Sequence, residues 1–340
     1  MPSTISQNIS LASLTTLGVG GNADFFASVC TLDELREVIS WAKNESHPVT
    51  ILGGGSNVLV SEDGVRGLVV HPVFQEIAYE YLDTDVLVTV GAGVELDVLI
   101  EKLVEKELWG LENLSAIPGT VGAVPVQNVG AYGVEAKDLI MQVIVYDSET
   151  NSMRAFSNEE CAFGYRDSIF KKSEGSTLII SSVIFRLHKT PSPSIAYRDV
   201  REYFGTNLTP SLSEIRNAIT DIRSKKLPDW RVVGTAGSFF KNPIVHKDVY
   251  ASLLNKYPLL PGFPEADGRI KIPLGWVLDN VCNLRGYREG NVWLHEKQAL
   301  VLVCEKTATE KEVTQFAQKI ISIVFEKTGI KIEQEVRTLK

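Results

Sequence analysis

The sequence predicts an α+β protein with more than one domain, and three observations support this prediction. The chain has 340 residues, of which 44% are hydrophobic and 22% charged, which is the balance of a packed globular protein too long for one small core. Short apolar runs typical of strands occur along the chain together with amphipathic stretches typical of helices. Many of the expected strands are joined by turns and not by helices, which favours an α+β layout.

The expected elements follow from the spacing of apolar residues. Helices are predicted where such residues recur on one helical face: at 33–43 (Leu35, Val38, Ile39, Ala42), after Gly93 (Leu96, Leu99, Ile100, Leu103), at 213–224 (Ile215, Ala218, Ile219, Ile222) and near 309–327 (Val313, Phe316, Ala317, Ile320, Val324). Strands are predicted at 49–52 in a buried pattern, at 58–60 and 68–70 around a turn at Asp63-Gly64, and at 86–90, 141–147, 178–187, 300–303 and 330–336. A Pro/Ser segment at 190–194 marks a connection or a protruding loop.

Composition excludes several classes of function. The net charge of −8 and the pI of about 5.3 disfavour a nucleic-acid partner, because the short basic runs at 171–172 and 225–226 form no strong basic patch. The four cysteines show neither zinc-ligand nor redox-pair spacing, so we expect no metal site and no disulfide framework. We find no signal segment and no apolar run long enough to cross a bilayer, and therefore expect a soluble, cytoplasmic protein with no membrane partner.

A glycine-rich turn, Gly53-Gly54-Gly55-Ser56-Asn57, lies between two expected strands. Its glycines permit positive φ and close approach of a ligand, and successive N–H groups in such a turn can hold an anion such as a pyrophosphate. A tight turn without a ligand explains the same composition. The turn is not a Walker loop, because the Lys-Ser/Thr ending is missing, and it is not a Rossmann fingerprint, because no helix is expected after it.

A second glycine-bearing loop covers residues 117–133 and contains four glycines, two prolines and no charged residue. Surface loops are ordinarily more polar. The composition indicates backbone packed against a large, partly apolar ligand, with a buried structural loop as the alternative. Two such loops in one chain favour a dinucleotide site.

Three polar segments could carry chemistry. In Gly164-Tyr165-Arg166-Asp167-Ser168, the arginine could hold a substrate carboxylate, or it could form an ordinary surface pair with the aspartate. Ser238, in Gly237-Ser238-Phe239-Phe240-Lys241-Asn242-Pro243, is not in a nucleophile elbow and could serve as a proton donor or as a cap or turn residue. Glu335 lies near the C-terminus, where tails are usually solvated. From the residues alone, these segments indicate a dinucleotide enzyme and no particular reaction.

Taken together, the segments resemble the UDP-N-acetylenolpyruvoylglucosamine reductase (MurB) family, from residues 16–21 to the final Glu335-Val336-Arg337. The most specific matches are the loop 117–133, the segment 163–170 and the segment 236–243, in the order that the family has; residues 226–229 and 298–301 add to them. Residues 195–199, Ile-Ala-Tyr-Arg-Asp, resemble the tyrosine-bearing loop of the longer, type I members.

The resemblance implies a fold and a division into domains. It implies an oxidase-type (PCMH) FAD-binding region at 1–190, with two subdomains split near residue 70. A connection with the tyrosine-bearing loop follows at 191–219, and then a smaller α+β substrate-binding domain at 220–320. The segment 321–340 is expected to supply a strand that returns to the FAD-binding region.

The resemblance also implies an activity, that of UDP-N-acetylmuramate dehydrogenase in peptidoglycan precursor synthesis. NADPH would reduce a non-covalently bound FAD, since the first loop has no histidine attachment site. Flavin N5 would then deliver hydride to C3 of the enolpyruvyl ether of a UDP-sugar, UDP-N-acetyl-3-O-(1-carboxyvinyl)-glucosamine, to give UDP-N-acetylmuramate. Arg166 and Glu335 would stabilise the enolate-like intermediate, and Ser238 would protonate C2. We expect a monomer.

The remaining expected site residues fall into two groups. Those implied for the cofactor are Gly53, Gly54, Gly55, Ser56, Asn57, Gly119, Gly122, Gln127, Gly130 and Tyr132. Those implied for the substrate are Tyr165, Tyr197, Lys226, Asn242 and Gln298.

Two positions depart from the family pattern. Phe263 stands where some members have a tyrosine thought to stack on the uracil, and the run 122–125 has Gly-Ala-Val-Pro where relatives often have small hydroxyl residues. Two other functions remain as alternatives. The first is a soluble oxidase of the same fold, which should lack the Ser238 segment and whose reduced flavin should react fast with oxygen. The second is a non-catalytic nucleotide-binding or scaffolding protein, which would not be yellow and bleached by NADPH.

Overall fold

A computed structural model describes residues 1–340, which divide into two compact units. The first unit comprises Met1–Ile9, Ala23–Gly55 and Arg66–Lys225, and the second comprises Ser10–Asn22, Ser56–Val65 and Lys226–Lys340. The chain therefore passes from one unit to the other within the first glycine turn. The domain boundaries that the resemblance implies stay predictions beside this division.

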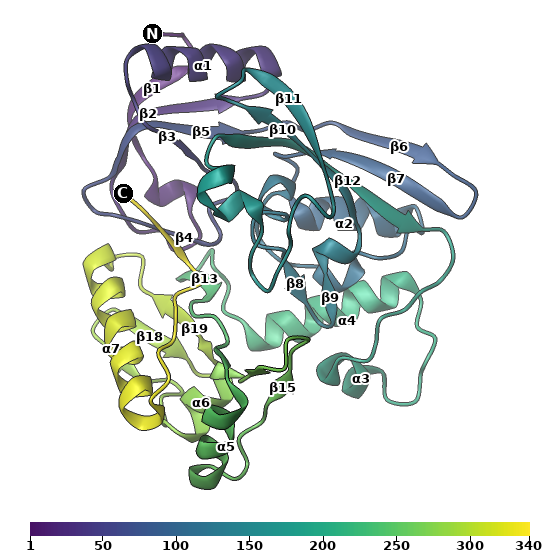
Figure 1. The fold of residues 1–340 in the computed structure, drawn as a ribbon, viewed down its shortest axis with the longest axis vertical. Coiled ribbons are helices and arrows are strands. Elements are labelled where there is room, and N and C mark those ends of the chain that lie inside the picture. Colours follow the sequence, from purple (N-terminus) through teal and green to yellow (C-terminus); the bar gives the residue numbers. More distant parts are fainter. The chain divides into compact units, whose positions relative to one another are not determined.

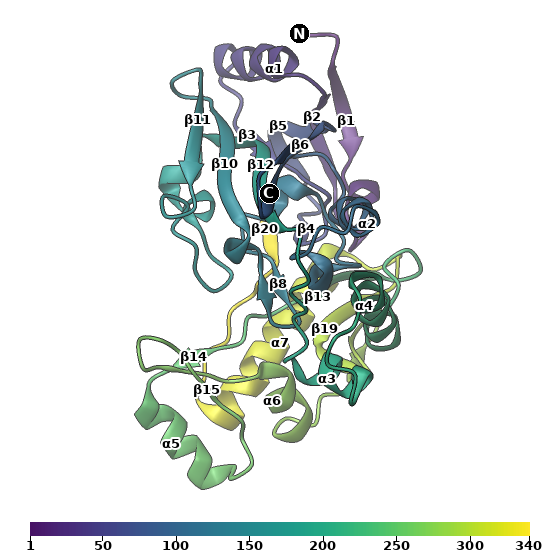
Figure 2. The same cartoon turned by 90° about the vertical axis from the view of Figure 1, so that its right-hand side faces the viewer.

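The first unit begins with a sheet covered by one helix. Its strands lie in the order β1-β2-β5-β3, with β3 parallel to β5: β1 Ile5–Ser10, β2 Asn22–Val29, β5 Val65–Pro72 and β3 Val49–Ile51. Helix α1, Leu32–Asn44, starts at Thr31, whose side chain accepts a hydrogen bond from the Glu34 N–H. As predicted, its buried face is Leu35, Val38, Ile39 and Ala42, which pack with residues of β2 and β5. Figures 1 and 2 show the helix beside this sheet.

The second sheet of this unit is antiparallel and carries the largest part of its core. The strands lie in the order β11-β10-β12-β7-β6: β11 Ser152–Ser157, β10 Ile140–Asp147, β12 Leu178–His188, β7 Asp85–Gly91 and β6 Ile77–Tyr81. Helix α2, Leu96–Glu105, buries its predicted face in the same core. The loop 117–133 follows this helix closely in the chain and ends in the small hairpin of β8, Gly130–Ala131, and β9, Val134–Glu135.

Two helices complete the first unit after the Pro/Ser segment. Helix α3 spans Arg198–Phe204 and α4 spans Leu212–Lys226. Ile215, Ile219 and Ile222 of α4 pack with Val200 of α3 and with Trp109. The predicted apolar face of α4 is thereby confirmed, and it packs α3 and α4 together with Trp109 of the first unit.

The second unit is built on an antiparallel sheet with α7 packed against it (Figure 1). Its strands lie in the order β13-β19-β18-β17: β13 Gly234–Ser238, β19 Gln298–Cys304, β18 Val292–His295 and β17 Arg288–Glu289. Helix α7, Glu310–Thr328, begins with a capping box of Thr309 and Glu312 and ends at Gly329 with φ 71°. The remaining elements are β4 Val58–Val60, β14 Ile244–Val245, α5 Lys247–Lys256, β15 Phe263–Pro264, β16 Ile270–Lys271, α6 Leu274–Asn280 and β20 Arg337–Leu339.

Two predicted strands, 49–52 and 330–336, differ from the structure, whereas those at 58–60 and 68–70 are present as β4 and as part of β5. The segment expected to be buried at 49–52 is an edge strand, β3, in which Val49 and Ile51 are each 38% exposed. The turn at Gly64 is present, with φ 81°, but the strands beside it do not pair: β4 pairs with β20, and β5 lies between β2 and β3. The final strand is Arg337–Leu339 and not 330–336, because residues just before it bond to the segment after β13.

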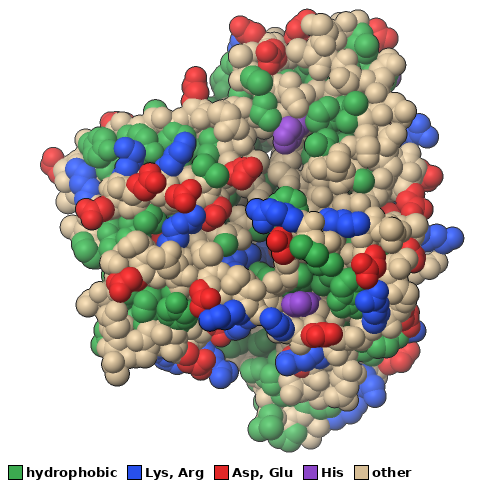
Figure 3. All heavy atoms as spheres, turned by 180° about the vertical axis from the view of Figure 1, so that it is seen from behind, with side chains coloured by type: hydrophobic (Ala, Val, Ile, Leu, Met, Phe, Trp, Pro, Cys, Tyr) green, Lys and Arg blue, Asp and Glu red, His purple; other side chains and the backbone are tan.

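On the face drawn in Figure 3, acidic and basic side chains are interspersed. All four cysteines are free. No helix combines the length and the apolar composition that a membrane span requires.

Candidate active site

The two glycine loops contact each other in the first unit. A Cβ added to Gly54 would lie 2.8 Å from the Cα of Gly119, and one added to Gly53 would lie 2.9 Å from Thr120 Oγ1. Real Cβ atoms do not approach other atoms so closely, so both positions require glycine because of the facing loop. Gly55, in contrast, has φ 62°, which favours glycine for its backbone conformation.

The polar groups of these loops fit a bound dinucleotide. The consecutive N–H groups of Gly53, Gly54 and Gly55 donate to no protein acceptor, which is the arrangement of an anion nest. The hydroxyl of Thr120, facing Gly53, is buried and has no hydrogen-bond partner in the protein. Buried hydroxyls are nearly always bonded, so this group is suited to a ligand. The residues present therefore fit FAD, whose pyrophosphate supplies the acceptors.

Gly122 plays a packing part within the second loop. Its N–H donates to the carbonyl of Ala92 at 2.8 Å, and an added Cβ would lie 2.7 Å from Ala92 Cβ. The adjacent Val121 N–H likewise donates to the carbonyl of Val94 at 2.8 Å. These bonds fix the start of the loop against the end of β7. The expected contact of Gly122 with the cofactor stays a prediction.

Asn128 fixes the second half of the loop and was not among the site residues predicted from the sequence. Asn128 is 1% exposed. Its Nδ2 donates to Glu135 Oε2 at 2.9 Å and to the Gly164 carbonyl at 3.0 Å. Its Oδ1 accepts from the Lys137 N–H at 3.0 Å. The backbone has φ 44°, a conformation that asparagine adopts more readily than most residues. An asparagine inside an uncharged glycine loop was the available signal.

Arg166 lies at the tip of a tight turn that Asn128 supports. The Gly164 N–H donates to the Asp167 carbonyl at 2.9 Å, which closes the turn, and Arg166 has φ 54°. Its guanidinium NH2 donates to the carbonyl of Gly130 at 3.2 Å. The structure therefore brings Arg166 to the second glycine loop, where its cationic group is oriented by main chain.

Tyr132 and Tyr197 lie together at the end of the second loop. Their rings meet edge to face with centroids 5.4 Å apart. Burial raises the pKa of both phenols, and Asp199 raises that of Tyr197 further. Both hydroxyls are therefore neutral and can donate hydrogen bonds. Tyr197 is 45% exposed, so its ring is accessible to a ligand.

A partly exposed charge network holds the segment just before the second loop. Asp97 of α2 accepts two hydrogen bonds from Arg216 of α4, at 2.6 and 3.2 Å, and a third from the Ala116 N–H at 2.6 Å. Arg223 donates from Nε to the Ala116 carbonyl at 3.2 Å. Burial favours a raised pKa for Asp97, but the Arg216 and Ala116 hydrogen bonds outweigh it and the pKa is lowered. No local pattern in the chain indicates this network, because Asp97 and Arg216 come from separate helices.

Ser238 and Glu335 are held on neighbouring segments of the second unit. Ser238 ends β13 and pairs with Val301 of β19. The next residue, Phe239, is fully buried and accepts at its carbonyl from the Glu335 N–H at 2.9 Å. The Lys241 N–H in turn donates to the Glu333 carbonyl at 2.9 Å. The structure thus brings two predicted catalytic residues together through main-chain pairing.

Asn57, the last residue of the first glycine turn, also bonds to this tail. Its carbonyl accepts from the Arg337 N–H at 3.1 Å, and its Nδ2 donates to the Glu335 carbonyl at 3.5 Å. Directly after it, β4 pairs in parallel with β20. A predicted cofactor residue and a predicted catalytic residue are therefore joined by the same strand pair.

The expected substrate residues of the second unit lie at α6 and at the end of α4. Asn242 Oδ1 accepts from the Leu274 N–H at 2.8 Å, at the start of α6. Gln298 begins β19, and its Oε1 would lie 3.0 Å from a Cβ on Gly275 in α6. Lys226 is the last residue of α4 and is partly buried. Asn242 and Gln298 therefore both lie near the start of α6.

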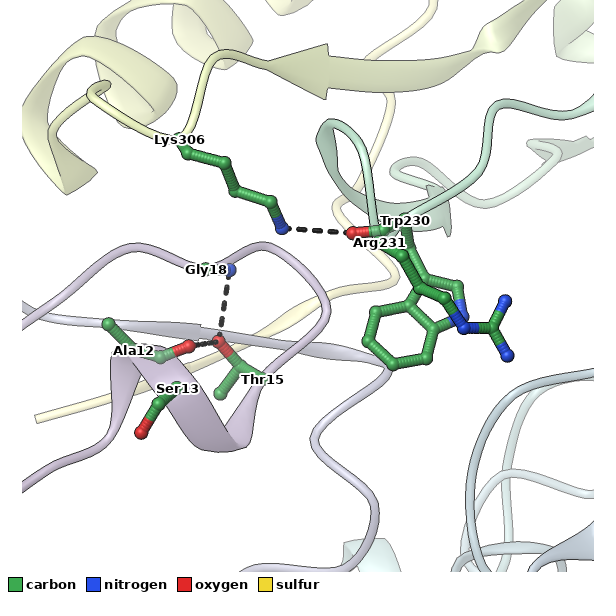
Figure 4. Close-up of a pocket in the computed structure, with 7 residues that line it drawn as sticks. All are labelled: Ala12, Ser13, Thr15, Gly18, Trp230, Arg231 and Lys306. Atoms are coloured by element: carbon green, nitrogen blue, oxygen red, sulfur yellow. Dashed lines mark hydrogen bonds between the residues drawn. The ribbon is translucent and has the colours of Figure 1, made fainter.

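A pocket elsewhere in the second unit contains none of the predicted residues. It has a volume of about 380 Å³ and is lined by Ala12, Ser13, Thr15, Gly18, Trp230, Arg231 and Lys306 (Figure 4). Lys306 Nζ donates to the Trp230 carbonyl at 2.9 Å, and Arg231 pairs with Asp229 at 3.4 Å. Its cationic groups therefore already have partners within the chain.

Comparisons with known proteins agree with this arrangement. An FAD-binding domain family matches residues 23–151, and the family of UDP-N-acetylenolpyruvoylglucosamine reductase C-terminal domains matches residues 228–339. The UDP-N-acetylenolpyruvoylglucosamine reductase of Pseudomonas syringae pv. tomato is 38% identical over 335 residues, covering 97% of this chain and 98% of that protein. That of Chromobacterium violaceum is 39% identical over 332 residues, covering 96% and 97%.

A solved structure is similar over the same length. The crystal structure of UDP-N-acetylenolpyruvylglucosamine reductase from Thermus caldophilus matches with a TM-score of 0.68 at 25% sequence identity, covering 98% of each chain. The domain matches, with the two facing glycine loops, define the class of the protein as an FAD-dependent oxidoreductase. The chain belongs to the UDP-N-acetylenolpyruvoylglucosamine reductase family. The predicted family and the predicted α+β fold, an oxidase-type FAD-binding domain with a smaller C-terminal domain, are confirmed.

Proposed function

We propose that this protein reduces UDP-N-acetyl-3-O-(1-carboxyvinyl)-glucosamine to UDP-N-acetylmuramate, using NADPH as the electron source and non-covalent FAD as the cofactor. Similarity over 97% of the chain to a relative with that printed activity supports the substrate. The FAD-binding domain match and the three unbonded amides of Gly53, Gly54 and Gly55 support the cofactor. We further propose that it acts as a cytoplasmic monomer.

The observation that carries the assignment of roles is the pairing of the Ser238 segment with the tail. Glu335 and Ser238 are held by main-chain bonds on either side of Phe239, whose ring is fully buried. Such a frame keeps a proton donor and a carboxyl group at a fixed separation, which is what proton transfer requires. It supports Ser238 as the group that protonates C2 and Glu335 as the group that stabilises the negative charge preceding that step.

Arg166 supplies the positive charge in this proposal. When bound, FAD supplies the hydride that adds to C3 of the alkene, after NADPH has reduced it. Negative charge then develops on C2 and the adjacent carboxylate of the substrate, and a guanidinium can bind such a carboxylate through two hydrogen bonds. The Gly130 carbonyl and the Asn128 side chain orient the Arg166 turn for this task.

The first and second glycine loops would hold the cofactor. The amides of residues 53–55 suit its pyrophosphate, and the Thr120 hydroxyl can donate one further bond. In the second unit, Lys226 suits the diphosphate of the UDP-sugar, while Asn242 and Gln298 offer amide groups near the start of α6. Tyr165 and Tyr197 would contact the substrate from the first unit.

Anaerobic mixing of the NADPH-reduced protein with the enolpyruvyl UDP-sugar tests the proposal. We expect the yellow absorption of the oxidised cofactor to return in proportion to the product formed. In the control, the reduced protein is mixed with UDP-N-acetylglucosamine, which lacks the enolpyruvyl group, and the cofactor should stay reduced. A colourless protein, or one whose reduced cofactor reacts with oxygen rapidly and with the alkene not at all, would refute it.

A further inference from the structure

Asn113 lies on the short turn Glu112–Leu114 after α2, and its side chain has no exposed surface. Its Nδ2 donates one hydrogen bond to the Tyr132 carbonyl at 2.9 Å and the other to the Ser194 carbonyl at 2.8 Å. These two carbonyls belong to different loops of the first unit. One loop is the second glycine loop, and the other is the Pro/Ser segment that leads to Tyr197. A single buried amide therefore joins them.

The amide group of Asn113 can have only one orientation. Two carbonyl oxygens face its nitrogen, and turning the group over would place Oδ1 against them. In the orientation observed, Oδ1 is buried and has no hydrogen-bond partner. Burying an unbonded acceptor is unfavourable. The residue thus combines two donated bonds with one unsatisfied oxygen, which indicates a role in holding the two loops.

The Asn113 bond is the sole hydrogen bond that residues 190–196 form with the rest of the chain. Ile195 adds apolar contact with the α3 and α4 cluster. Gly133 lies beside the segment, and a Cβ there would meet Tyr197 Cβ at 3.7 Å and Ser194 Oγ at 3.9 Å, which are ordinary packing distances. On its N-terminal side, the position of Tyr197 therefore depends on this buried hydrogen bond and on the Ile195 contact, while α3 holds it on the other side through Val200.

We propose that Asn113 is a positioning residue that anchors the segment 190–197, and thereby sets the affinity for substrate through Tyr197. The inference rests on the proposed function, in which Tyr197 contacts the enolpyruvyl UDP-sugar. Without the anchor, the segment samples other conformations, and only the fraction with Tyr197 in place binds substrate. Affinity falls in proportion to that fraction. The chemical step in the bound complex uses other residues and keeps its rate.

Asn113→Ala in the FAD-loaded protein tests the proposal through two independent measurements. The first is the rate at which chymotrypsin cleaves after Tyr197, identified by mass spectrometry, since proteolysis reports local opening. We expect cleavage to be about tenfold faster than in the unmodified protein. The second is steady-state kinetics, in which KM for the UDP-sugar should rise about tenfold while kcat changes less than twofold.

Asn158→Ala provides a control in which a side chain of the same type, at an exposed position, loses two such bonds. The Nδ2 of Asn158 also bonds two main-chain carbonyls, those of Lys137 and Ile140, each at 2.7 Å. Because neither carbonyl belongs to residues 190–197, this variant should change neither the cleavage after Tyr197 nor KM. Equal effects of the two variants would show that loss of any such bond loosens the unit generally, and would overturn the proposal.

A second variant, Asn113→Asp, covers the case in which Asn113→Ala does not fold. An ionised carboxylate repels both carbonyls, whereas a protonated one can donate to one of them. Cleavage after Tyr197 should therefore slow as the pH is lowered from 8 to 5, relative to the unmodified protein. Unchanged cleavage in both variants overturns the anchor even if the protein has no reductase activity. Faster cleavage with unchanged KM retains the anchor and refutes the role of Tyr197 in substrate binding.

Discussion

The main-chain N–H of Glu335 donates a 2.9 Å hydrogen bond to the carbonyl of Phe239, the residue that follows Ser238. This bond attaches the C-terminal tail to the end of β13, and the side chain of Phe239 is buried beneath it. Because main-chain atoms form the attachment, the side chains of Ser238 and Glu335 are not needed for it. Substitution of either side chain can therefore remove a chemical group while the frame remains.

Ser238→Ala should separate the two halves of the proposed reaction. Reduction of the cofactor by NADPH does not need a proton donor at C2, so its rate should stay within about twofold of normal. Reoxidation by the enolpyruvyl UDP-sugar should slow by about 10²- to 10⁴-fold, the range typical of losing a general acid. Stopped-flow absorbance of each half-reaction measures both rates. Equal damage to the two would contradict the donor role.

Much of the fold could be predicted because its signals are local. The buried faces of α1, α2, α4 and α7 contain the residues expected from helical periodicity. The final strand was misplaced because pairing partners, and not composition, decide where it lies. Residues before Arg337 bond to the segment after β13, and Arg337–Leu339 pair with β4, far away in the sequence.

Site residues that lie in a sequence motif could be predicted. Site residues that are held by hydrogen bonds to distant parts of the chain could not. Glycine runs marked both loops, and the resemblance marked Arg166, Ser238 and Glu335. Asn128 and Asn113 were missed, because their partners Gly164 and Ser194 lie 36 and 81 residues away in the chain. Nothing in a short window distinguishes such an asparagine from one in an ordinary turn.

Thr120→Val should weaken FAD binding while stabilising the protein without its cofactor. Valine keeps the shape of threonine but removes the buried hydroxyl that has no protein partner. If that hydroxyl donates to FAD, its loss costs about 1 to 1.5 kcal/mol of binding free energy, or about tenfold in Kd. The apoprotein should gain about 1 kcal/mol, because an unsatisfied polar group is gone. Fluorescence titration with FAD and denaturant unfolding measure the two effects.

Thr16→Val is the control for this prediction. The Thr16 hydroxyl is also buried without a partner, but it lies in the second unit and outside the glycine loops. This change should stabilise the protein and leave the Kd for FAD unaltered. If Thr120→Val likewise stabilises without affecting FAD, the hydroxyl does not contact the cofactor.

Gly54→Ala should abolish tight FAD binding by pushing the two loops apart. The new Cβ would lie 2.8 Å from Gly119 Cα, a backbone atom that cannot move aside as a flexible side chain could. We expect a destabilisation of about 1 to 3 kcal/mol, as is usual for overpacking, and a purified protein without yellow colour. Gly329→Ala serves as the comparison, because φ 71° makes it unfavourable while no atom lies within 4 Å of the added Cβ. That variant should lose stability yet retain FAD; loss of cofactor in both would mean that instability alone releases it.

Glu112→Gln should stabilise the protein increasingly as the pH rises from 4 to 8. Glu112 is 2% exposed, and burial raises the pKa of its carboxyl, opposed only in part by hydrogen bonds such as that from the Gly110 N–H and by the charge of His188. A carboxyl whose pKa is higher in the folded state favours folding most below its unfolded pKa, and this contribution is lost as the pH rises through the folded value. Glutamine keeps an acceptor for Gly110 but does not ionise, so the variant escapes the cost of a buried charge at neutral pH. Unfolding free energies from denaturant titrations across this pH range should diverge between the original protein and the Glu112→Gln variant. A difference that is constant with pH would show that the buried carboxyl does not titrate in the folded protein over this range.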